Sequence, residues 1–351
     1  MRKQPEKRLQ MQCSGSANYR ITGVMPAMLP NAMAVATGAA LPRTETGRLY
    51  MGGRACHQNS HHQNTGHQIR WNLISDRPIM WARFRKGHLF IMLSDTECQH
   101  LLTALVDPVR RAGDKIMEIH ARGVVARKKP DGSPVSEADE AAEAILLQAL
   151  TGLAPEIPVI SEENADSHKL APSDQFFLVD PVDGTREFLR PDSNGAFTVN
   201  IGLIQHGAPV MGIVFAPALG RLFHGVVGVG ASEQAAGTSR RLEVRPVPQN
   251  GAVAMASRSH RDDQTNDWLA ANGITETLAT GSSLKFGLLA AGEADVYPRF
   301  GPTMEWDTAA GEAVLRAAGG MVICPDGTPF IYGKPEYRNG AFIACAGYRI
   351  P

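Results

Sequence analysis

The chain has 351 residues, of which 43% are apolar and 20% charged, so it is a globular protein of one or two domains and not a fibrous, low-complexity or wholly disordered one. It holds no uninterrupted apolar run of about 18 residues, which excludes a membrane-spanning helix. The zero net charge combines a basic segment, residues 1–92 at +10, with an acidic body, residues 93–351 at −10, and such a body favours divalent cations over nucleic acid as partners.

Residues 1–92 show no sustained strand or helix period, so no core face is visible in them. We interpret this segment as a disordered leader or as translation upstream of a true start at Met92. Three alternatives are a secretory signal, an organelle transit peptide and a metal-binding tract, the last because of a histidine-rich patch: His57, His61, His62 and His67. The five cysteines are widely spaced with no CxxC pair, which argues against a disulfide framework or a structural zinc site and indicates a reducing, cytoplasmic compartment.

From residue 94 onward the pattern becomes regular. Ser94 or Asp95 can cap a helix whose apolar positions keep helical spacing until about Gly123. A strand, a Pro-Asp-Gly turn and a second strand follow at 124–135, and Ser136 opens a further helix, running to Leu150, with an S-x-x-D capping pattern. Apolar segments between turn residues then predict five strands, the last three forming an antiparallel meander: 158–161, 176–179, 197–204, 209–215 and 221–227.

After about residue 245, strands and helices alternate. The pattern predicts strands at 253–256, 294–297 and 342–346, and helices at 262–271, 282–291 and 306–318. Such alternation is typical of a layered α/β lobe. We therefore expect an α+β layered sandwich with an N-terminal lobe at about 93–245 and a C-terminal lobe at about 246–351.

Acidic residues carry the candidate chemistry. The apolar strand 176–179 runs into Asp180, where Pro181 is expected to stop the strand, and Asp183 and Gly184 follow in a tight turn. Two carboxylates and the intervening carbonyl can then face one point, and such hard oxygen ligands suit Mg²⁺, Mn²⁺ or Ca²⁺.

Taken singly, each acidic group has a structural explanation. Asp-x-x-Asp-Gly is also a common turn, and Glu162-Glu163 can be a solvated loop. Asp139 can be the N3 residue of a capping box, and Asp307 can be an acid favoured by a helix dipole.

Together these segments resemble a known family. Glu162-Glu163, then the run D-P-V-D-G-T at 180–185, then W-D-T-A-A-G at 306–311, are similar to the inositol monophosphatase superfamily of metal-dependent, lithium-sensitive phosphatases. The resemblance covers about residues 95–350. Within the superfamily, five further segments resemble the CysQ branch, the 3′(2′),5′-bisphosphate nucleotidases: 183–188, 197–201, 257–260, 281–286 and 297–302. The resemblance implies an αβαβα sugar-phosphatase fold with the metal site between two lobes.

The resemblance also implies a set of metal ligands for two or three Mg²⁺ ions. Glu162, Asp180 and the Val182 carbonyl would hold a first ion. Asp180, Asp183 and Asp307 would hold a second, so Asp180 would bridge the two. Metal ions in such a site neutralise phosphate charge and activate water.

Asp139 and Thr185 are the implied catalytic pair, because the Thr185 hydroxyl can accept from the attacking water while it donates to Asp139. The amides of Gly184 and Thr185 would bind phosphate oxygens. The implied substrate-binding residues are Val182, Asp183, Gly184, Thr185, Asp307, Lys285 and Arg299.

The implied substrate is adenosine 3′,5′-bisphosphate, whose 3′-phosphate would be removed to give AMP, with action on the sulfated nucleotide of sulfate activation also implied. Lys285 and Arg299 are candidates for the 5′-phosphate, with Arg258 and His260 behind them; each can also be a surface cation. Trp306 is expected in the core, bracing Asp307, and its alternative is a base-stacking platform.

Two other functions stay open at this point. An inositol monophosphatase or broad sugar phosphatase would use the same metal site, and a noncatalytic nucleotide-binding protein would keep the fold without turnover. The expected partner is a small-molecule nucleotide and not a nucleic acid. The expected location is the cytoplasm, with at most peripheral contact with the inner membrane through the basic segment 1–92.

Overall fold

The computed structural model describes residues 9–12, 18–21, 67–70, 81–85, 88–124, 126–128, 134–171, 173–190, 195–257 and 262–350. The chain divides into two units, Met1–Met92 and Leu93–Pro351. In the first unit, β1 (Leu9–Gln12) pairs with β2 (Asn18–Ile21), and β3 (His67–Arg70), β4 (Trp81–Arg85) and β5 (His88–Ile91) form an antiparallel sheet. His57, His61 and His62 of the histidine-rich patch lie outside the described residues.

The centre of the second unit is a seven-stranded sheet in the order β14-β13-β12-β11-β10-β9-β8. Its neighbouring strands are antiparallel except for the parallel pair β8 and β9. The strands span β8 Val159–Ser161, β9 Gln175–Asp183, β10 Thr198–Gln205, β11 Ala208–Ala216, β12 Arg221–Val226, β13 Gly230–Ala235 and β14 Thr238–Leu242. The predicted meander is confirmed as β10–β12, whereas β13 and β14 were not predicted.

Two long helices cover one face of this sheet: α2 (Asp95–Ala121) and α3 (Glu137–Leu153). Both begin with a capping box, which satisfies two backbone donors at once: Ser94 with Glu97, and Ser136 with Asp139. The hairpin of β6 (Ala126–Lys128) and β7 (Pro134–Ser136) joins the two helices. The predicted boundaries of these helices hold to within a few residues.

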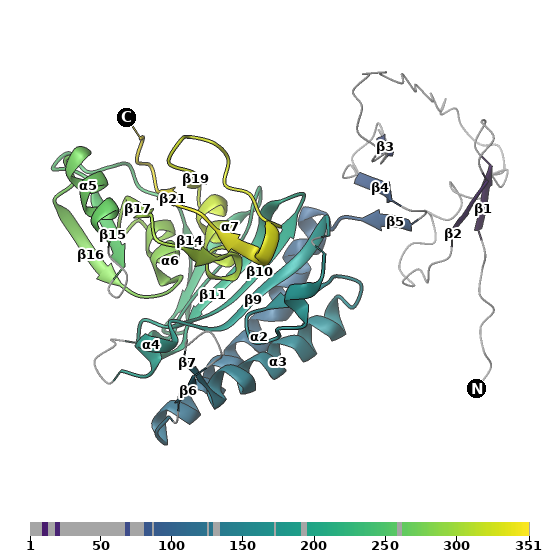
Figure 1. Ribbon diagram of the computed structural model, residues 1–351, viewed down its shortest axis with the longest axis horizontal. Coiled ribbons are helices and arrows are strands. Elements are labelled where there is room, and N and C mark those ends of the chain that lie inside the picture. Colours follow the sequence, from purple (N-terminus) through teal and green to yellow (C-terminus); the bar gives the residue numbers. More distant parts are fainter. Residues whose placement is uncertain are drawn as a thin grey trace. The chain divides into compact units, whose positions relative to one another are not determined.

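A second sheet of five strands has the order β16-β15-β17-β21-β19. Its elements are β15 Val253–Ser257, β16 Glu276–Thr280, β17 Val296–Arg299, β19 Met321–Ile323 and β21 Phe342–Cys345. Helices α6 (Leu284–Ala290) and α7 (Ala309–Ala317) share one hydrophobic core with both sheets, and α5 (Asp263–Ala271) packs on the outer face of the second sheet. The layers therefore alternate as α, β, α, β, α, which confirms the expected α+β sandwich (Figure 1).

Short elements complete the chain around the acidic residues. They are η1 Ser167–Lys169, α4 Thr185–Phe188, η2 Pro217–Leu219, β18 Thr303–Met304, η3 Glu305–Asp307, η4 Pro335–Tyr337 and β20 Arg338–Asn339. The helix expected at 306–318 is thus divided: η3 is a single 3₁₀ turn, and α7 begins at Ala309. Throughout the described ranges, every helix is too short or too polar to traverse a lipid bilayer.

A row of glycines lets α7 lie directly on the seven-stranded sheet. Gly202, Gly212 and Gly225 are paired across β10, β11 and β12. A Cβ atom at Gly212 would lie 2.2 Å from the Ala310 carbonyl oxygen, and one at Gly202 would lie 2.8 Å from the Ala310 nitrogen. Any side chain on this row would push α7 away from the sheet. The row therefore sets how close the start of α7, just after Asp307, comes to the acidic end of β9.

Candidate metal centre

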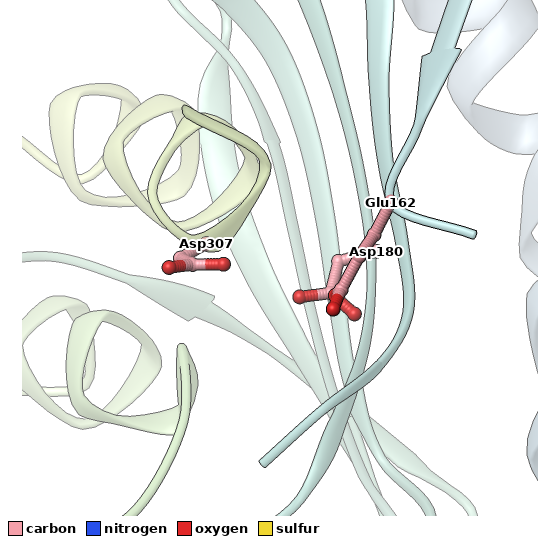
Figure 2. Close-up of side chains that lie close together, drawn as sticks. All are labelled: Glu162, Asp180 and Asp307. Carbon is pink, nitrogen blue, oxygen red and sulfur yellow. The ribbon is translucent and has the colours of Figure 1, made fainter. Parts of the chain in front are cut away.

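Three carboxylates from distant parts of the sequence converge between the two sheets. Glu162 follows β8, Asp180 lies within β9, and Asp307 ends η3 just before α7. One oxygen of each lies within 4.8 Å of those of the other two. Figure 2 shows Asp307 pointing from its helical turn toward the pair formed by Glu162 and Asp180.

A β-bulge at Pro181 presents Asp180 to this site. Asp180 pairs with Asn200, and Asp183 pairs with Thr198, so β9 uses one more residue than β10 over this stretch. The expectation that Pro181 ends the strand is therefore wrong: β9 continues to Asp183. A bulge tolerates the proline because the extra residue needs no ladder hydrogen bond. The Val182 amide donates to Asp180 Oδ1 at 3.1 Å and fixes the carboxylate.

The electrostatics of the cluster favour a bound cation. Burial and then the neighbouring charge of Glu162 raise the pKa of Asp180 well above its usual range. Burial and then Asp183 do the same to the pKa of Asp307. Asp180 is 1% exposed, and its Oδ2 atom has no hydrogen-bond partner among the described residues. An orphaned buried carboxylate oxygen beside two more acids fits the oxygen-ligand preference of Mg²⁺.

Asp183 lies beside the cluster and is held by the C-terminal half of the chain. The Ser283 backbone amide and hydroxyl approach Asp183 Oδ2 at 2.5 and 2.7 Å. Asn200 donates to the same oxygen at 3.4 Å. Burial raises the pKa of Asp183, while Ser283 and the positive charge of Lys285 act in the opposite direction. Asp183 is therefore positioned by a network of donors, whereas Asp180 keeps an unused oxygen.

The proposed water-activating pair is also in contact. Asp139 is 1% exposed at the start of α3, and its Oδ2 accepts from the Ser136 amide at 2.8 Å and from the Ser136 hydroxyl at 2.7 Å. Its other oxygen, Oδ1, lies 3.5 Å from the Thr185 hydroxyl, which lies 3.2 Å from the Val182 carbonyl oxygen. The hydroxyl has one proton and can donate to one of these acceptors at a time. Asp139 is thus both a helix cap and a neighbour of Thr185.

Gly184 makes the turn that follows β9. Its φ of 88° lies in the left-handed region, where a side chain would be strained. The one-turn helix α4 starts at the next residue, Thr185, two residues after β9 ends at Asp183. This is the tight turn that the Asp-Gly pair predicts.

Lys285 and Arg299 are both buried near the acids. Lys285 is 4% exposed, its ammonium group donates to the Ser282 carbonyl at 2.7 Å, and burial lowers its pKa to about 8. Arg299 is 8% exposed and donates to the carbonyls of Gly301 and Pro302 at 3.2 and 3.3 Å. Neither is a surface cation. Arg258 and His260 lie outside the described residues.

Sequence reasoning gave no role to Ser283 and Asn200, although both connect to Asp183. Asn200 also donates to the Ser283 hydroxyl at 3.1 Å. Both residues lie in segments that carry the family resemblance, and that was the available signal. Trp306 is 5% exposed, which confirms its expected place in the core.

Comparison with known proteins finds a matching family model and related nucleotidases. The model of the inositol monophosphatase family matches residues 97–346. The 3′(2′),5′-bisphosphate nucleotidase CysQ of Salmonella typhimurium is 43% identical over 225 residues, which are 63% of this chain and 89% of that protein. The CysQ protein of Escherichia coli K12 is 40% identical over 246 residues, covering 69% of this chain and 98% of its own.

Solved structures agree with the sequence comparisons. CysQ from Bacteroides thetaiotaomicron superposes with a TM-score of 0.61 at 35% identity, covering 72% of this chain and 98% of that one. An inositol monophosphatase from Anabaena superposes with a TM-score of 0.56 at 25% identity, covering 72% and 92%. The fold and the arrangement of the body are thus those of these proteins.

Proposed function

This chain belongs to the inositol monophosphatase family, and we propose that it is a Mg²⁺-dependent 3′(2′),5′-bisphosphate nucleotidase. Its substrate is adenosine 3′,5′-bisphosphate, from which it releases the 3′-phosphate to leave AMP, and it acts on the 3′-phosphorylated, sulfated nucleotide as well. The observation that carries this proposal is the cluster of Glu162, Asp180 and Asp307, in which Asp180 is buried and its Oδ2 atom has no hydrogen-bond partner among the described residues. The identity of 40–43% with CysQ nucleotidases over most of their length supports the choice of substrate.

Each residue near the cluster has a place in this proposal. Glu162, Asp180 and the Val182 carbonyl would hold one Mg²⁺, and Asp180, Asp183 and Asp307 would hold another, with room in the proposal for a third ion. Bound Mg²⁺ supplies charge neutralisation for the phosphate and activation of water.

The chain's own groups manage the proton of the attacking water. With its proton donated to Asp139 Oδ1, the Thr185 hydroxyl oxygen is free to accept from water. As the water oxygen bonds to phosphorus, its proton passes to the Thr185 oxygen and the Thr185 proton passes to Asp139. The bond from phosphorus to the 3′-oxygen breaks, and that oxygen takes up a proton from solvent water. The amides of Gly184 and Thr185 orient the phosphate, with Val182, Asp183 and Asp307 lining the same side.

The experiment is a phosphate-release assay on four substrates: adenosine 3′,5′-bisphosphate, its sulfated relative, inositol 1-phosphate and fructose 1,6-bisphosphate. We expect the two nucleotides to have the highest kcat/KM and chelation by EDTA to stop all turnover. Asp180→Asn should be inactive and folded, which excludes a contaminating phosphatase. A preference for inositol 1-phosphate would overturn the nucleotidase assignment, and turnover by none of the four would favour a noncatalytic binding role.

The cellular place follows from the same proposal. A nucleotide phosphatase of this kind works where its small-molecule substrate is made, which we take to be the cytoplasm. The described cysteines Cys98, Cys324 and Cys345 are free thiols, in keeping with a reducing compartment.

A further inference from the structure

His168 joins the two segments that carry Glu162 and Asp307. It lies in η1, six residues after Glu162, and its ring stacks on the indole of Trp306 with centroids 4.8 Å apart and planes inclined by 19°. Trp306 directly precedes Asp307 in η3. His168, from the N-terminal half, thus contacts Trp306, the residue next to Asp307. Asp307 is the member of the acidic cluster that comes from the C-terminal half.

The other end of the His168 ring holds the loop of Glu162. His168 Nε2 lies 2.8 Å from the carbonyl oxygen of Ser161, and because a carbonyl can only accept, Nε2 carries the proton and donates. Ser161 directly precedes Glu162. The Ser161 amide donates to the Ser167 hydroxyl at 3.1 Å, so η1 is hydrogen-bonded to both the N–H and the carbonyl group of Ser161.

A second aromatic side chain also contacts the indole of Trp306. Tyr337, from η4, lies 6.5 Å from Trp306 between ring centroids, and its hydroxyl donates to the Leu170 carbonyl at 3.0 Å. Leu170 follows η1 directly. Trp306 therefore contacts two aromatic side chains, His168 from the segment 167–170 and Tyr337, which is hydrogen-bonded to that segment. Its own 5% exposure leaves it little freedom to shift.

We propose that His168 is a positioning residue that fixes the spacing between Glu162 and Asp307 and so sets the affinity of the site for divalent cations. The Nε2 donor determines where the backbone before Glu162 lies, and the ring face determines where the turn before Asp307 lies. Loss of either contact frees one carboxylate relative to the other. This role rests on the proposed metal site, but it concerns a residue outside the acidic cluster.

The test is direct binding of Mn²⁺, followed by the electron paramagnetic resonance of free Mn²⁺, on the full chain at one fixed pH. Wild type should bind Mn²⁺, and His168→Ala should bind it about five- to a hundredfold more weakly, the loss expected for one hydrogen bond and one ring contact. His168→Phe keeps a ring and His168→Asn keeps a donor, so each should lose less than His168→Ala. His100→Ala, at an exposed position on α2, is the matched control and should bind as wild type does.

Activity supplies the second readout. In the variants the Mg²⁺ concentration for half-maximal rate should rise, whereas kcat at saturating Mg²⁺ and KM for nucleotide should stay near wild-type values. Wild-type Mn²⁺ affinity in all three His168 variants overturns the proposal, and so does a lowered kcat without a change in metal affinity. Failure of wild type itself to bind Mn²⁺ would instead overturn the metal site, so the two failures are distinguishable.

Discussion

Ser283 places both its backbone amide and its hydroxyl on one oxygen of Asp183, at 2.5 and 2.7 Å, across 100 residues of sequence. The same hydroxyl lies 2.6 Å from the carbonyl oxygen of Asp307. One serine therefore touches two of the acidic residues proposed to hold metal, one from each half of the body. The contact fixes Asp183 while leaving Asp180 with an unused oxygen.

Replacing Ser283 should affect the position of Asp183 more than it affects the stability of the fold. We expect Ser283→Ala to lower kcat/KM for adenosine 3′,5′-bisphosphate by about tenfold, because a hydrogen bond to a charged group is worth roughly 1.5–3 kcal/mol and the amide contact stays. Steady-state kinetics at saturating Mg²⁺ measure the loss. Ser239→Ala, on the exposed face of β14, is the control and should change nothing. Unchanged kinetics in Ser283→Ala would show that the amide alone positions Asp183.

A methyl group on the glycine row should separate α7 from the sheet. We expect Gly212→Ala to lower the free energy of unfolding by about 1–3 kcal/mol, the usual cost of overpacking, and to lower activity because Asp307 moves with α7. Denaturant unfolding and the phosphate assay measure the two effects. Gly152→Ala has open space around its Cβ within α3 and should instead gain up to about 1 kcal/mol. Full activity in a destabilised Gly212→Ala variant would show that the glycine row does not control the position of Asp307.

Neutralising Lys285 or Arg299 should reduce the preference for adenosine 3′,5′-bisphosphate over inositol 1-phosphate. If either cation binds the 5′-phosphate, Lys285→Met or Arg299→Met should lower kcat/KM for adenosine 3′,5′-bisphosphate by about one to two orders of magnitude. Inositol 1-phosphate lacks that phosphate, so its slower turnover should barely change. For Lys285, whose pKa is about 8, KM for the bisphosphate should also rise as the pH passes 8 and the positive charge is lost.

Equal losses of kcat/KM for both substrates would assign Lys285 and Arg299 a different role. The Lys285 Nζ atom lies 5.1 Å from the centre of the Tyr297 ring. The negative charge of Asp183 raises the pKa of Lys285 against the effect of burial. Such losses would mean that the two residues support the fold or the shared acidic cluster and do not recognise the nucleotide.

Glu312 should make the metal-free protein less stable as the pH rises. Burial is the main cause that raises its pKa to about 8, and Tyr332 donates to its Oε2 at 2.7 Å. Between about pH 4.5 and 8 the folded state keeps a proton that the unfolded state has released, so stability falls across this window and levels off above it. Urea unfolding in EDTA at pH 5, 6.5 and 8 should show a shallower fall for Glu312→Gln. Equal slopes in the two proteins would mean that Glu312 is ionised in the folded state.

Residues 1–91 should be dispensable for catalysis. They lie outside the matched range 97–346, and the first contacts of the body begin at Leu93, whose amide donates to Gln175 at 3.1 Å and whose carbonyl accepts from Gln205 at 3.1 Å. A chain that starts at Met92 keeps both contacts. Its kcat and melting temperature should equal those of the full chain, and a marked drop in either would show that the leader packs on the body.

The parts of the fold that the sequence predicts are those with strong local signals. Helices α2 and α3 combine capping boxes with helical apolar spacing, and β10–β12 are apolar strands between tight turns. Strand β14 was not predicted because four of its five residues are exposed, so it has no buried alternation. The continuation of β9 through Pro181 depends on pairing with β10, which the local sequence does not specify.

The sequence predicts which residues form the acidic cluster but not the contacts that surround them. The family resemblance named Glu162, Asp180 and Asp307, and the structure brings them together. The contacts of Ser283 and of His168 join residues that are 100 and 138 positions apart, and no spacing rule connects them. Such contacts depend on how two layers pack, which is a property of the whole fold.

The position of Asp307 in the C-terminal half would give the proposed cation a mechanical role in addition to its chemical one. A cation shared by Asp180 and Asp307 would close a loop of more than a hundred residues, as a covalent crosslink between these positions would. Unlike a crosslink, its contribution grows with the free ion concentration, since a ligand that binds only the folded state stabilises it by RT ln(1 + [L]/Kd). With the proposed Mg²⁺ bound, the stability of the packing between the two layers would therefore depend on the free Mg²⁺ concentration around the protein.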